Sequence, residues 1–257
     1  YGKVRVREAL ERSLNAATLR VTEQVGLRRV IDQARASGIH SLIRSNPAAL
    51  LGASEVSLLE ITAAYGTLAR GGEWIKPVAI KKVTDDRGWV LFEERRERRW
   101  AASPQAAFLV TSLLQGAIDR GTAASARRLG LARSAAGKTG TSNDLRDAWF
   151  VGYTPDLVAG VWVGVDSGAS LRLTAAQAAL PMWTSFIEQA SAGHPPRSFA
   201  PPPGIVMAKI DPMSGLRVGS GCSGGVDEIF IQGTEPTESC PEGEMLFFSW
   251  LRRIFSR

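Results

Sequence analysis

The chain has 257 residues, of which 44% are apolar and 22% are charged, and no tract is of low complexity. This composition predicts a folded protein with a sizeable core. No run of about 18 apolar residues occurs, so no membrane-spanning helix is predicted. The net charge of +6 fits an acidic substrate, an anionic membrane surface or nucleic acid. Basic residues do not cluster with interleaved aromatics, which argues against a nucleic-acid partner.

Two cysteines, Cys222 and Cys240, lie in the C-terminal part, and neither belongs to a CxxC or His-rich motif. His40 and His194 are far from them in the sequence, so no metal site is predicted, and no organic cofactor is implied. In an oxidising compartment the two thiols are a candidate disulfide, whereas in the cytosol they would remain free.

Residues 5–36 carry apolar side chains at helical spacing. Ser13 and Asn15 interrupt this pattern with residue types that favour caps and turns. We therefore place both residues at or near a junction between two helices. Gly26 punctuates the segment that follows.

The next helix is predicted over 54–70, where Ser57 and Glu60 form a capping box. Residues 77–92 predict two short strands around an Asp-Arg-Gly turn. The mixed-sign run EERRERR that follows is interpreted as a solvated hairpin or loop. A further helix begins at Ser103-Pro104 and extends to Gly121.

Short β-rich runs then alternate with Asn-Asp and Thr-Pro-Asp turns over 137–165. They predict an antiparallel meander of about three strands. A helix over 174–191 follows. Its apolar side is expected to consist of Leu180, Met182, Trp183, Phe186 and Ile187.

The pattern divides the chain into a domain over 1–193, a Pro-rich linker over 194–204 and a tail over 205–257. The last residues, MLFFSWLRRIFSR, form a basic amphipathic pattern on a helix. Such an element could make peripheral contact with an anionic membrane, although packing against the tail or fraying is the simpler interpretation.

Two short motifs carry the functional signal. Ser13-Leu14-Asn15 fits Ser-x-Asn, and Lys138-Thr139-Gly140 fits Lys-Thr-Gly on a strand. Both are signatures of active-site serine acyltransferases that act on penicillin-like and D-alanyl-D-alanine substrates. Longer phrases add to the match, among them VREALERSLN, LGASEVSLLEITAAYGTLARGG, QGAIDRGTAASA, AAGKTGTSNDLRDAWFVGYTPDLVAGVWVG and GTEPTESCP. Over nearly its whole length the chain resembles class A penicillin-binding proteins, the bifunctional enzymes that polymerise and crosslink peptidoglycan.

The resemblance implies the fold of penicillin-binding transpeptidases and β-lactamases. This is an α/β fold of the α+β type, with a mainly antiparallel sheet flanked by helices. It also implies roles for the first motif: Ser13 would relay a proton to the leaving amine, and Asn15 would bind the peptide amide of the substrate.

The second motif would bind the substrate's terminal carboxylate. Lys138 would attract that anion and organise the serine of the first motif, while the hydroxyls of Thr139 and Thr141 would bind it directly. Gly140 would let the substrate backbone lie against the strand edge. The backbone N–H of Thr141 would be one donor of an oxyanion hole.

The third family signature, Ser-x-x-Lys, carries the nucleophile and is missing, because none of the six lysines has a serine three residues before it. In the family this signature precedes Ser-x-Asn by several dozen residues, whereas only twelve residues precede Ser13. We therefore expect the chain to begin inside the transpeptidase domain. It should form no acyl-enzyme alone and be poorly stable without the upstream part of the same protein.

The expected function is that of a peptidoglycan D,D-transpeptidase fragment, with stem peptides as substrates and β-lactams as ligands once the nucleophile is present. The expected location is periplasmic or extracytoplasmic, anchored to the membrane through an upstream segment. A serine β-lactamase or D,D-carboxypeptidase shares the motifs, and a non-catalytic interaction module is also left open. Asp147, Trp149 and Phe150 are interpreted as structural, and Thr122 in DRGTA is given no role.

Overall fold

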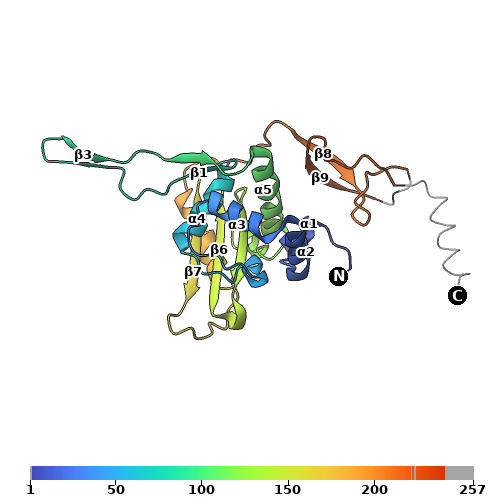
Figure 1. Ribbon diagram of the computed structural model, residues 1–257, viewed down its shortest axis with the longest axis horizontal. Helices are drawn as coiled ribbons and strands as arrows, with labels where there is room; N and C mark the ends of the chain where they lie inside the picture. Colours follow the sequence, from blue (N-terminus) through green and yellow to red (C-terminus); the bar gives the residue numbers. More distant parts are fainter. Residues whose placement is uncertain (1, 221, 223, 241–257) are drawn as a thin grey trace, which may run out of the picture. The chain divides into compact units, whose positions relative to one another are not determined.

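The computed structural model describes residues 2–220, 222 and 224–240, except the side chain of Pro47 (Figure 1). The chain forms two compact units. The larger unit is Val6–Ala200, and the smaller one combines the first five residues with the segment that begins at Pro201. The boundary between Ala200 and Pro201 falls inside the Pro-rich segment of the sequence.

Groups of helices and groups of short strands follow one another along the larger unit. Its helices are α1 (Val6–Glu11), α2 (Asn15–Val25), α3 (Leu27–Ala36), α4 (Leu58–Ala69), α5 (Pro104–Asp119), α6 (Ser125–Arg128) and α7 (Ala179–Ala190), with the 3-10 turns η1 (Pro47–Leu51) and η2 (Asn143–Leu145). Its strands are β1 (Glu73–Ile75), β2 (Lys82–Thr84), β3 (Val90–Glu93), β4 (Arg98–Trp100), β5 (Ala136–Thr141), β6 (Asp147–Tyr153) and β7 (Val158–Gly164).

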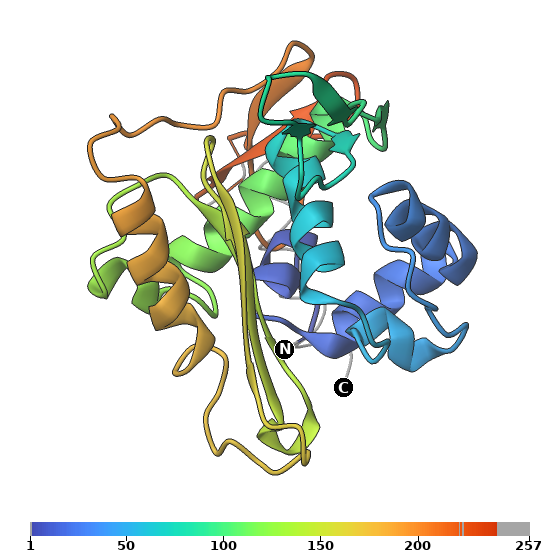
Figure 2. The same ribbon diagram turned by 90° about the vertical axis from the view of Figure 1, so that its left-hand side faces the viewer.

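The central feature of this unit is a three-stranded sheet in the order β5-β6-β7. Both pairs are antiparallel, with Thr139 opposite Phe150 and Phe150 opposite Val161. Figure 2 shows the sheet nearly edge on, with α7 on one side and α4 and the N-terminal helices on the other. The predicted meander and the mainly antiparallel sheet flanked by helices are both confirmed.

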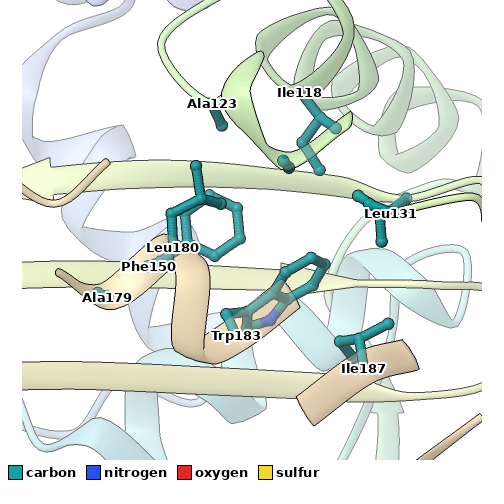
Figure 3. Packing of buried hydrophobic residues seen from close by; sticks show 10 residues of the cluster. Ile118, Ala123, Leu131, Phe150, Ala179, Leu180, Trp183 and Ile187 are labelled. Carbon is teal, nitrogen blue, oxygen red and sulfur yellow. The ribbon is translucent and has the colours of Figure 1, made fainter. Parts of the chain in front are cut away.

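The face toward α7 carries the main hydrophobic core (Figure 3). Trp183 and Ile187 of α7 are fully buried against Phe150 of β6. The rings of Phe150 and Trp183 meet edge to face, with centroids 4.8 Å apart, in the geometry that aromatic pairs prefer. Burial on this scale anchors α7 to the sheet.

The opposite face of the sheet packs on α1, α4 and α5 through Tyr153 and Ala136. Leu10 of α1 and Tyr65 of α4 join this cluster. The hydroxyl of Tyr153 lies 2.8 Å from Thr111 Oγ1, and Thr111 Oγ1 donates to the carbonyl of Ala107 at 2.8 Å. Because the Thr111 proton is engaged, Tyr153 is the donor in the first bond.

Most predicted element boundaries agree with the structure. The break in the first helical segment is confirmed, since α1 ends at Glu11 and α2 begins at Asn15. The capping box is also confirmed, because the Ser57 side chain accepts from Glu60 N while the Glu60 side chain accepts from the backbone of Ser57. This box places the start of α4 at Leu58, four residues later than predicted.

The prediction for α7 was wrong in two respects. Residues 175–178 form turns, and Thr174 donates its hydroxyl to Gln177 Oε1 at 3.0 Å, so the helix begins at Ala179. Local bonding of a threonine side chain competes with helix formation in this way. Met182 and Phe186 were expected on the apolar side but are 57% and 51% exposed. They lie one turn apart on the solvent side of α7.

The segment that connects α4 to α5 in the sequence forms two small two-stranded sheets. The pair β2 with β3 confirms the two predicted strands, although β2 begins only at Lys82. The charged run over 93–99 is largely exposed, as expected. Its end was interpreted only as hairpin or loop, yet Arg98–Trp100 forms β4 and pairs with β1.

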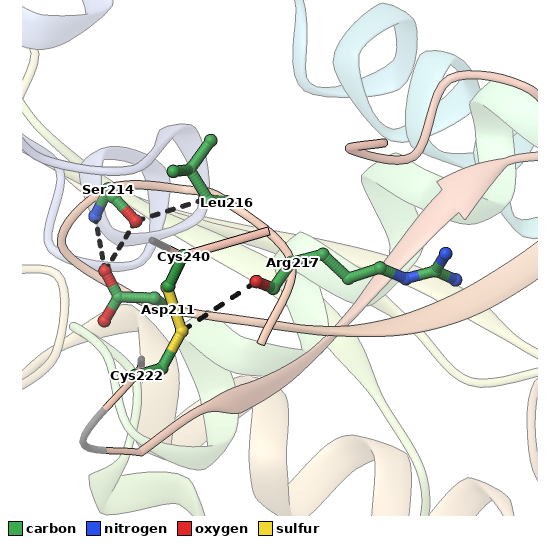
Figure 4. The surroundings of a disulfide bond; sticks show 6 residues. All are labelled: Asp211, Ser214, Leu216, Arg217, Cys222 and Cys240. Carbon is green, nitrogen blue, oxygen red and sulfur yellow. Dashed lines mark hydrogen bonds between the residues drawn. A yellow bond between two sulfur atoms is a disulfide. The ribbon is translucent and has the colours of Figure 1, made fainter. Parts of the chain in front are cut away.

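The smaller unit contains the antiparallel pair β8 (Ile205–Ile210) and β9 (Val226–Ile231). Cys222 and Cys240 form a disulfide, with their Cα atoms 5.7 Å apart (Figure 4). The backbone of Arg217 lies beside this bridge and accepts a hydrogen bond from Cys240 N at 3.1 Å. The disulfide therefore joins the two segments that flank β9.

No helix within the described ranges is both long enough and apolar enough to cross a bilayer. The amphipathic helix predicted for the last 13 residues lies outside the described residues.

Glu60 links the segment after α3 to the start of α4. Its Oε1 atom accepts from the backbone N–H groups of His40 and Ser41, both at 2.9 Å. Its Oε2 atom accepts from the hydroxyl of Ser41 at 2.6 Å. These bonds, led by the Ser41 hydroxyl, lower the pKa of Glu60 to about 2.

Replacement Glu60→Gln should reduce the free energy of unfolding at pH 7 by about 1–2 kcal/mol, because an amide cannot accept all the donors that converge on the carboxylate. The folded-state pKa of Glu60 is depressed, so the wild-type advantage is full above pH 4.5 and is lost as the pH falls toward 2. Urea unfolding between pH 2 and 7 measures this, with Glu55→Gln as the control. A difference that is independent of pH would contradict it.

Replacement of both Cys222 and Cys240 by serine should destabilise the smaller unit by about 3 kcal/mol, because the bridge restricts its unfolded chain. Hydrogen exchange of the β8 and β9 amides measures this effect, with the β5–β7 amides as the internal reference. Equal protection of β8 and β9 in the bridged and serine forms would show that the prediction is wrong.

Candidate active site

The Ser-x-Asn motif occupies the sharp junction between α1 and α2. Ser13 N donates to Leu10 O at 3.1 Å, and Leu14 N donates to Ala9 O at 2.8 Å, which is the pattern of a Schellman helix end. Ser13 occupies the left-handed position of this motif with a φ of 57°. Glycine usually takes that position, so a serine there carries a backbone cost of about 1 kcal/mol.

Both polar side chains of this junction are open to solvent. Ser13 and Asn15 are exposed, and among the described residues neither side chain makes a hydrogen bond. Asn15 is the first residue of α2, so the helix fixes its backbone while its amide remains available. The junction therefore presents a hydroxyl and an amide on a rigid corner.

The Lys-Thr-Gly motif lies on β5, an edge strand of the central sheet. Within the described part of the chain, no other strand pairs with the outer edge of β5. Side chains alternate along a strand, so Lys138 lies on the same face as Ala136, two residues before it. Leu10 of α1 packs against the cluster that contains Ala136 and its cross-strand partner Tyr153, so Lys138 shares a sheet face with α1.

Lys138 carries a half-buried ammonium group near the middle of this strand. Its Nζ donates to the carbonyl of Thr139 at 3.1 Å and lies 3.4 Å from Thr139 Oγ1. No carboxylate of the described residues lies within ion-pair distance of it. Burial lowers the pKa of Lys138 to about 8. A desolvated cation of this kind favours an anionic ligand.

Thr122 connects the two motifs. Its backbone N–H donates to the carbonyl of Glu11, the last residue of α1, at 3.0 Å. Its hydroxyl lies 2.7 Å from the hydroxyl of Thr139 on β5. The chain just before Ser13 is therefore joined to the residue after Lys138 through a single threonine.

The Glu11 side chain strengthens this junction. It is 7% exposed and makes a bidentate ion pair with Arg120, with Arg120 Nε–Oε2 at 2.9 Å and Nη2–Oε1 at 2.5 Å. Arg7 lies 3.6 Å from the same carboxylate and also donates to the carbonyl of Ser112 at 3.0 Å. These contacts bind α1 to α5.

The other predicted site residues lie along the same strand. Gly140 pairs with Trp149 of β6, and a Cβ atom at Gly140 would lie 3.3 Å from Trp149 Cβ. The hydroxyl of Thr141 accepts from Ala175 N at 3.2 Å, which leaves its own proton for another partner. Trp149 also faces Trp162, whose indole N–H donates to Asp147 at 2.9 Å.

Sequence reasoning missed Glu11, Arg120 and Thr122 as parts of the site. Thr122 lies in the sequence DRGTA. The Gly-Thr pair directly after a long helix was the one sequence feature that could have indicated a role for Thr122. The partner of Glu11 lies 109 residues away in the sequence, so spacing alone gives no indication of this ion pair.

The described residues contain no group of three or more metal-ligating side chains. A hollow of about 470 Å³ lies in the segment before α4 and contains none of the predicted site residues. Ser41, Leu42, Arg44, Ala53, Glu55, Val56 and Ser57 line it.

Comparisons with known proteins show which family this chain is similar to. Residues 1–176 match the penicillin-binding protein transpeptidase domain, and residues 201–244 match the C-terminal domain of penicillin-binding protein 1A. The chain is 35% identical to penicillin-binding protein 1A of Aquifex aeolicus over 94% of its own length and 33% of the relative's length. For penicillin-binding protein 2D of Bacillus subtilis the identity is 33%, over 91% of this chain and 34% of the relative.

Solved structures give the same result. Penicillin-binding protein 1A from Haemophilus influenzae superposes with a TM-score of 0.83 at 27% identity, over 93% of this chain and 41% of that chain. The PonA1 protein from Mycobacterium tuberculosis, solved in complex with penicillin V, superposes with a TM-score of 0.65 at 27% identity, over 76% of this chain and 58% of that chain.

An edge strand with Lys-Thr-Gly beside a Ser-x-Asn helix junction defines the class of penicillin-recognising proteins. This chain belongs to the penicillin-binding protein transpeptidase family, and it is of the class A, 1A-like type with the matching C-terminal domain. It spans about a third of the length of the curated relatives that it matches.

Replacement Lys138→Met should raise the free energy of unfolding at pH 7 by about 1–2 kcal/mol, because it removes a partly desolvated charge that has no counterion among the described residues. The folded-state pKa of about 8 lies below the ordinary value of 10.5, so the folded form releases its proton first. The penalty in the wild type is therefore full below pH 8 and disappears as the pH rises to 10.5.

Denaturant unfolding between pH 7 and 11 measures this difference, with the exposed Lys82→Met as the control. A destabilised Lys138→Met variant at pH 7 would mean that an anionic partner in the chain already compensates the charge.

Proposed function

We propose that this chain supplies the substrate-binding part of a peptidoglycan D,D-transpeptidase site. The observation that carries the proposal is Lys138, a half-buried and partly desolvated ammonium without a carboxylate partner among the described residues. It lies on the edge strand β5 and on the sheet face of α1. A peptide that ends in a carboxylate can extend along this edge as an added strand. Its carboxylate would then neutralise the ammonium.

The residues around Lys138 are suited to that carboxylate. The Thr139 hydroxyl lies within 3.4 Å of the ammonium, and the Thr141 hydroxyl retains its proton while it accepts from Ala175 N. Two hydroxyl donors and a cation match the two oxygens of a carboxylate. Gly140 between them keeps side-chain atoms away from the peptide backbone.

The reaction begins with a serine that a Ser-x-x-Lys segment supplies, since the 257 residues contain no such motif. The serine oxygen attacks the carbonyl carbon of the penultimate D-alanine, and the bond from that carbon to the nitrogen of the terminal D-alanine breaks. The serine proton passes through Ser13 to the leaving amine. An amine of a second stem peptide then attacks the ester, forms the crosslink and returns the serine to its free form.

Asn15 positions the substrate for this attack. Its exposed amide is free of partners in the described part of the chain and can bind the peptide group of the donor strand from the side opposite β5. The Thr141 N–H is the proposed oxyanion donor. We also place the protein outside the cytoplasm, because the disulfide between Cys222 and Cys240 requires oxidising conditions.

Labelling with a fluorescent penicillin tests the proposal. The 257-residue chain should show no covalent label, whereas the same chain joined to a Ser-x-x-Lys segment should be labelled. In the joined chain Lys138→Ala should slow acylation by about 10²-fold or more, because the carboxylate loses its counterion and the transition state loses electrostatic support. Glu55→Gln serves as the matched control. Covalent labelling of the 257-residue chain, or unchanged acylation in Lys138→Ala, would exclude this assignment.

A further inference from the structure

We propose that Thr122 is a positioning residue that sets the distance between the Ser13–Asn15 corner and the Lys138–Thr139 end of β5. This inference deepens the proposed function, since the two groups form the opposite walls of the proposed peptide site. Thr122 itself would not touch the reacting atoms. It would act through Glu11 on one wall and through Thr139 on the other.

The backbone of Thr122 fixes the first wall. Its N–H donates to Glu11 O at 3.0 Å, and Glu11 precedes Ser13 by two residues at the end of α1. Ser13 and Leu14 bond back to the carbonyls of α1, so the corner has little freedom relative to Glu11. A displacement of Thr122 would therefore displace the hydroxyl and amide of the corner.

The side chain of Thr122 fixes the second wall. Its hydroxyl lies 2.7 Å from Thr139 Oγ1, the usual distance of a hydrogen bond between two hydroxyls. Thr139 Oγ1 in turn lies 3.4 Å from Lys138 Nζ. Loss of the Thr122 hydroxyl would free the Thr139 side chain, and the ammonium would lose a fixed neighbour.

The backbone on both sides of Thr122 is tightly packed. Ala123 is completely buried and donates to Ala117 O at 2.9 Å. A Cβ atom on Gly121 would overlap the carbonyl of Glu11, and one on Gly116 would overlap its carboxylate. The chain at 116–123 thus approaches Glu11 as closely as glycine permits, and the bidentate pair with Arg120 holds it there.

An isosteric pair of variants of the 257-residue chain tests the inference. Thr122→Val removes the hydroxyl and keeps the shape, whereas Thr122→Ser keeps the hydroxyl. Spin labels at Ala16→Cys and Asn143→Cys, both exposed positions, report the distance between the walls, and the disulfide-bonded Cys222 and Cys240 do not react. Thr122→Val should broaden or shift the distance distribution, Thr122→Ser should preserve it, and the exposed Thr84→Val should leave it unchanged.

Binding gives the second readout. The probe Nα,Nε-diacetyl-Lys-D-Ala-D-Ala is titrated into each variant and followed by NMR. Thr122→Val should weaken binding by about tenfold, the equivalent of one lost hydrogen bond, while Thr122→Ser should stay within about twofold of the wild type.

The two readouts separate the two claims. If the wild type does not bind the probe, the proposed function fails, and the spin-label distances still decide the role of Thr122. Unchanged distances in Thr122→Val would overturn the positioning role. The same would follow if Thr122→Ser altered the distances as much as Thr122→Val, because the hydroxyl would then not be the cause.

Discussion

The candidate site depends on one buried carboxylate. Glu11 ends a helix of only six residues, and such a short helix has little stability of its own. Its orientation is fixed because Arg120 and Arg7 bind the Glu11 side chain while Thr122 binds the Glu11 carbonyl. A buried carboxylate is tolerated only with such complete pairing, and removal of one partner is expensive. The position of the Ser13–Asn15 corner therefore follows from contacts with α5 and the segment after it.

Two local features of the site oppose stability. Ser13 adopts a left-handed backbone conformation that favours glycine, and Lys138 is desolvated without a counterion among the described residues. The fold tolerates these two unfavourable features because the surrounding core is well packed. Phe150 and Trp183 are buried on one face of the sheet and Tyr153 on the other. Backbone strain and desolvated charge are each found more often at functional sites than elsewhere in proteins.

Local sequence signals predicted the local structure. The Ser57–Glu60 capping box, the break at Ser13–Asn15 and the alternation of β5 to β7 depend on neighbouring residues, and the sequence contains them. The start of α7 was missed because side-chain bonds of Thr174 outweigh the helical periodicity. The exposure of Met182 and Phe186 depends on which elements cover α7, which periodicity does not specify. For the site, the two motifs were visible in the sequence, but the contacts of Thr122 and Glu11 join distant segments and needed the folded chain.

The shifted pKa of Lys138 couples occupancy of the site to the proton concentration. An anion bound beside the ammonium stabilises the charged form and returns the pKa toward its ordinary range. Because the pKa of Lys138 is lowered to about 8, binding of an anion near that pH would be accompanied by proton uptake from solution. The measured heat of binding would then vary with the ionisation enthalpy of the buffer. For the peptide binding proposed above, capture of the peptide and uptake of a proton would then be parts of one equilibrium.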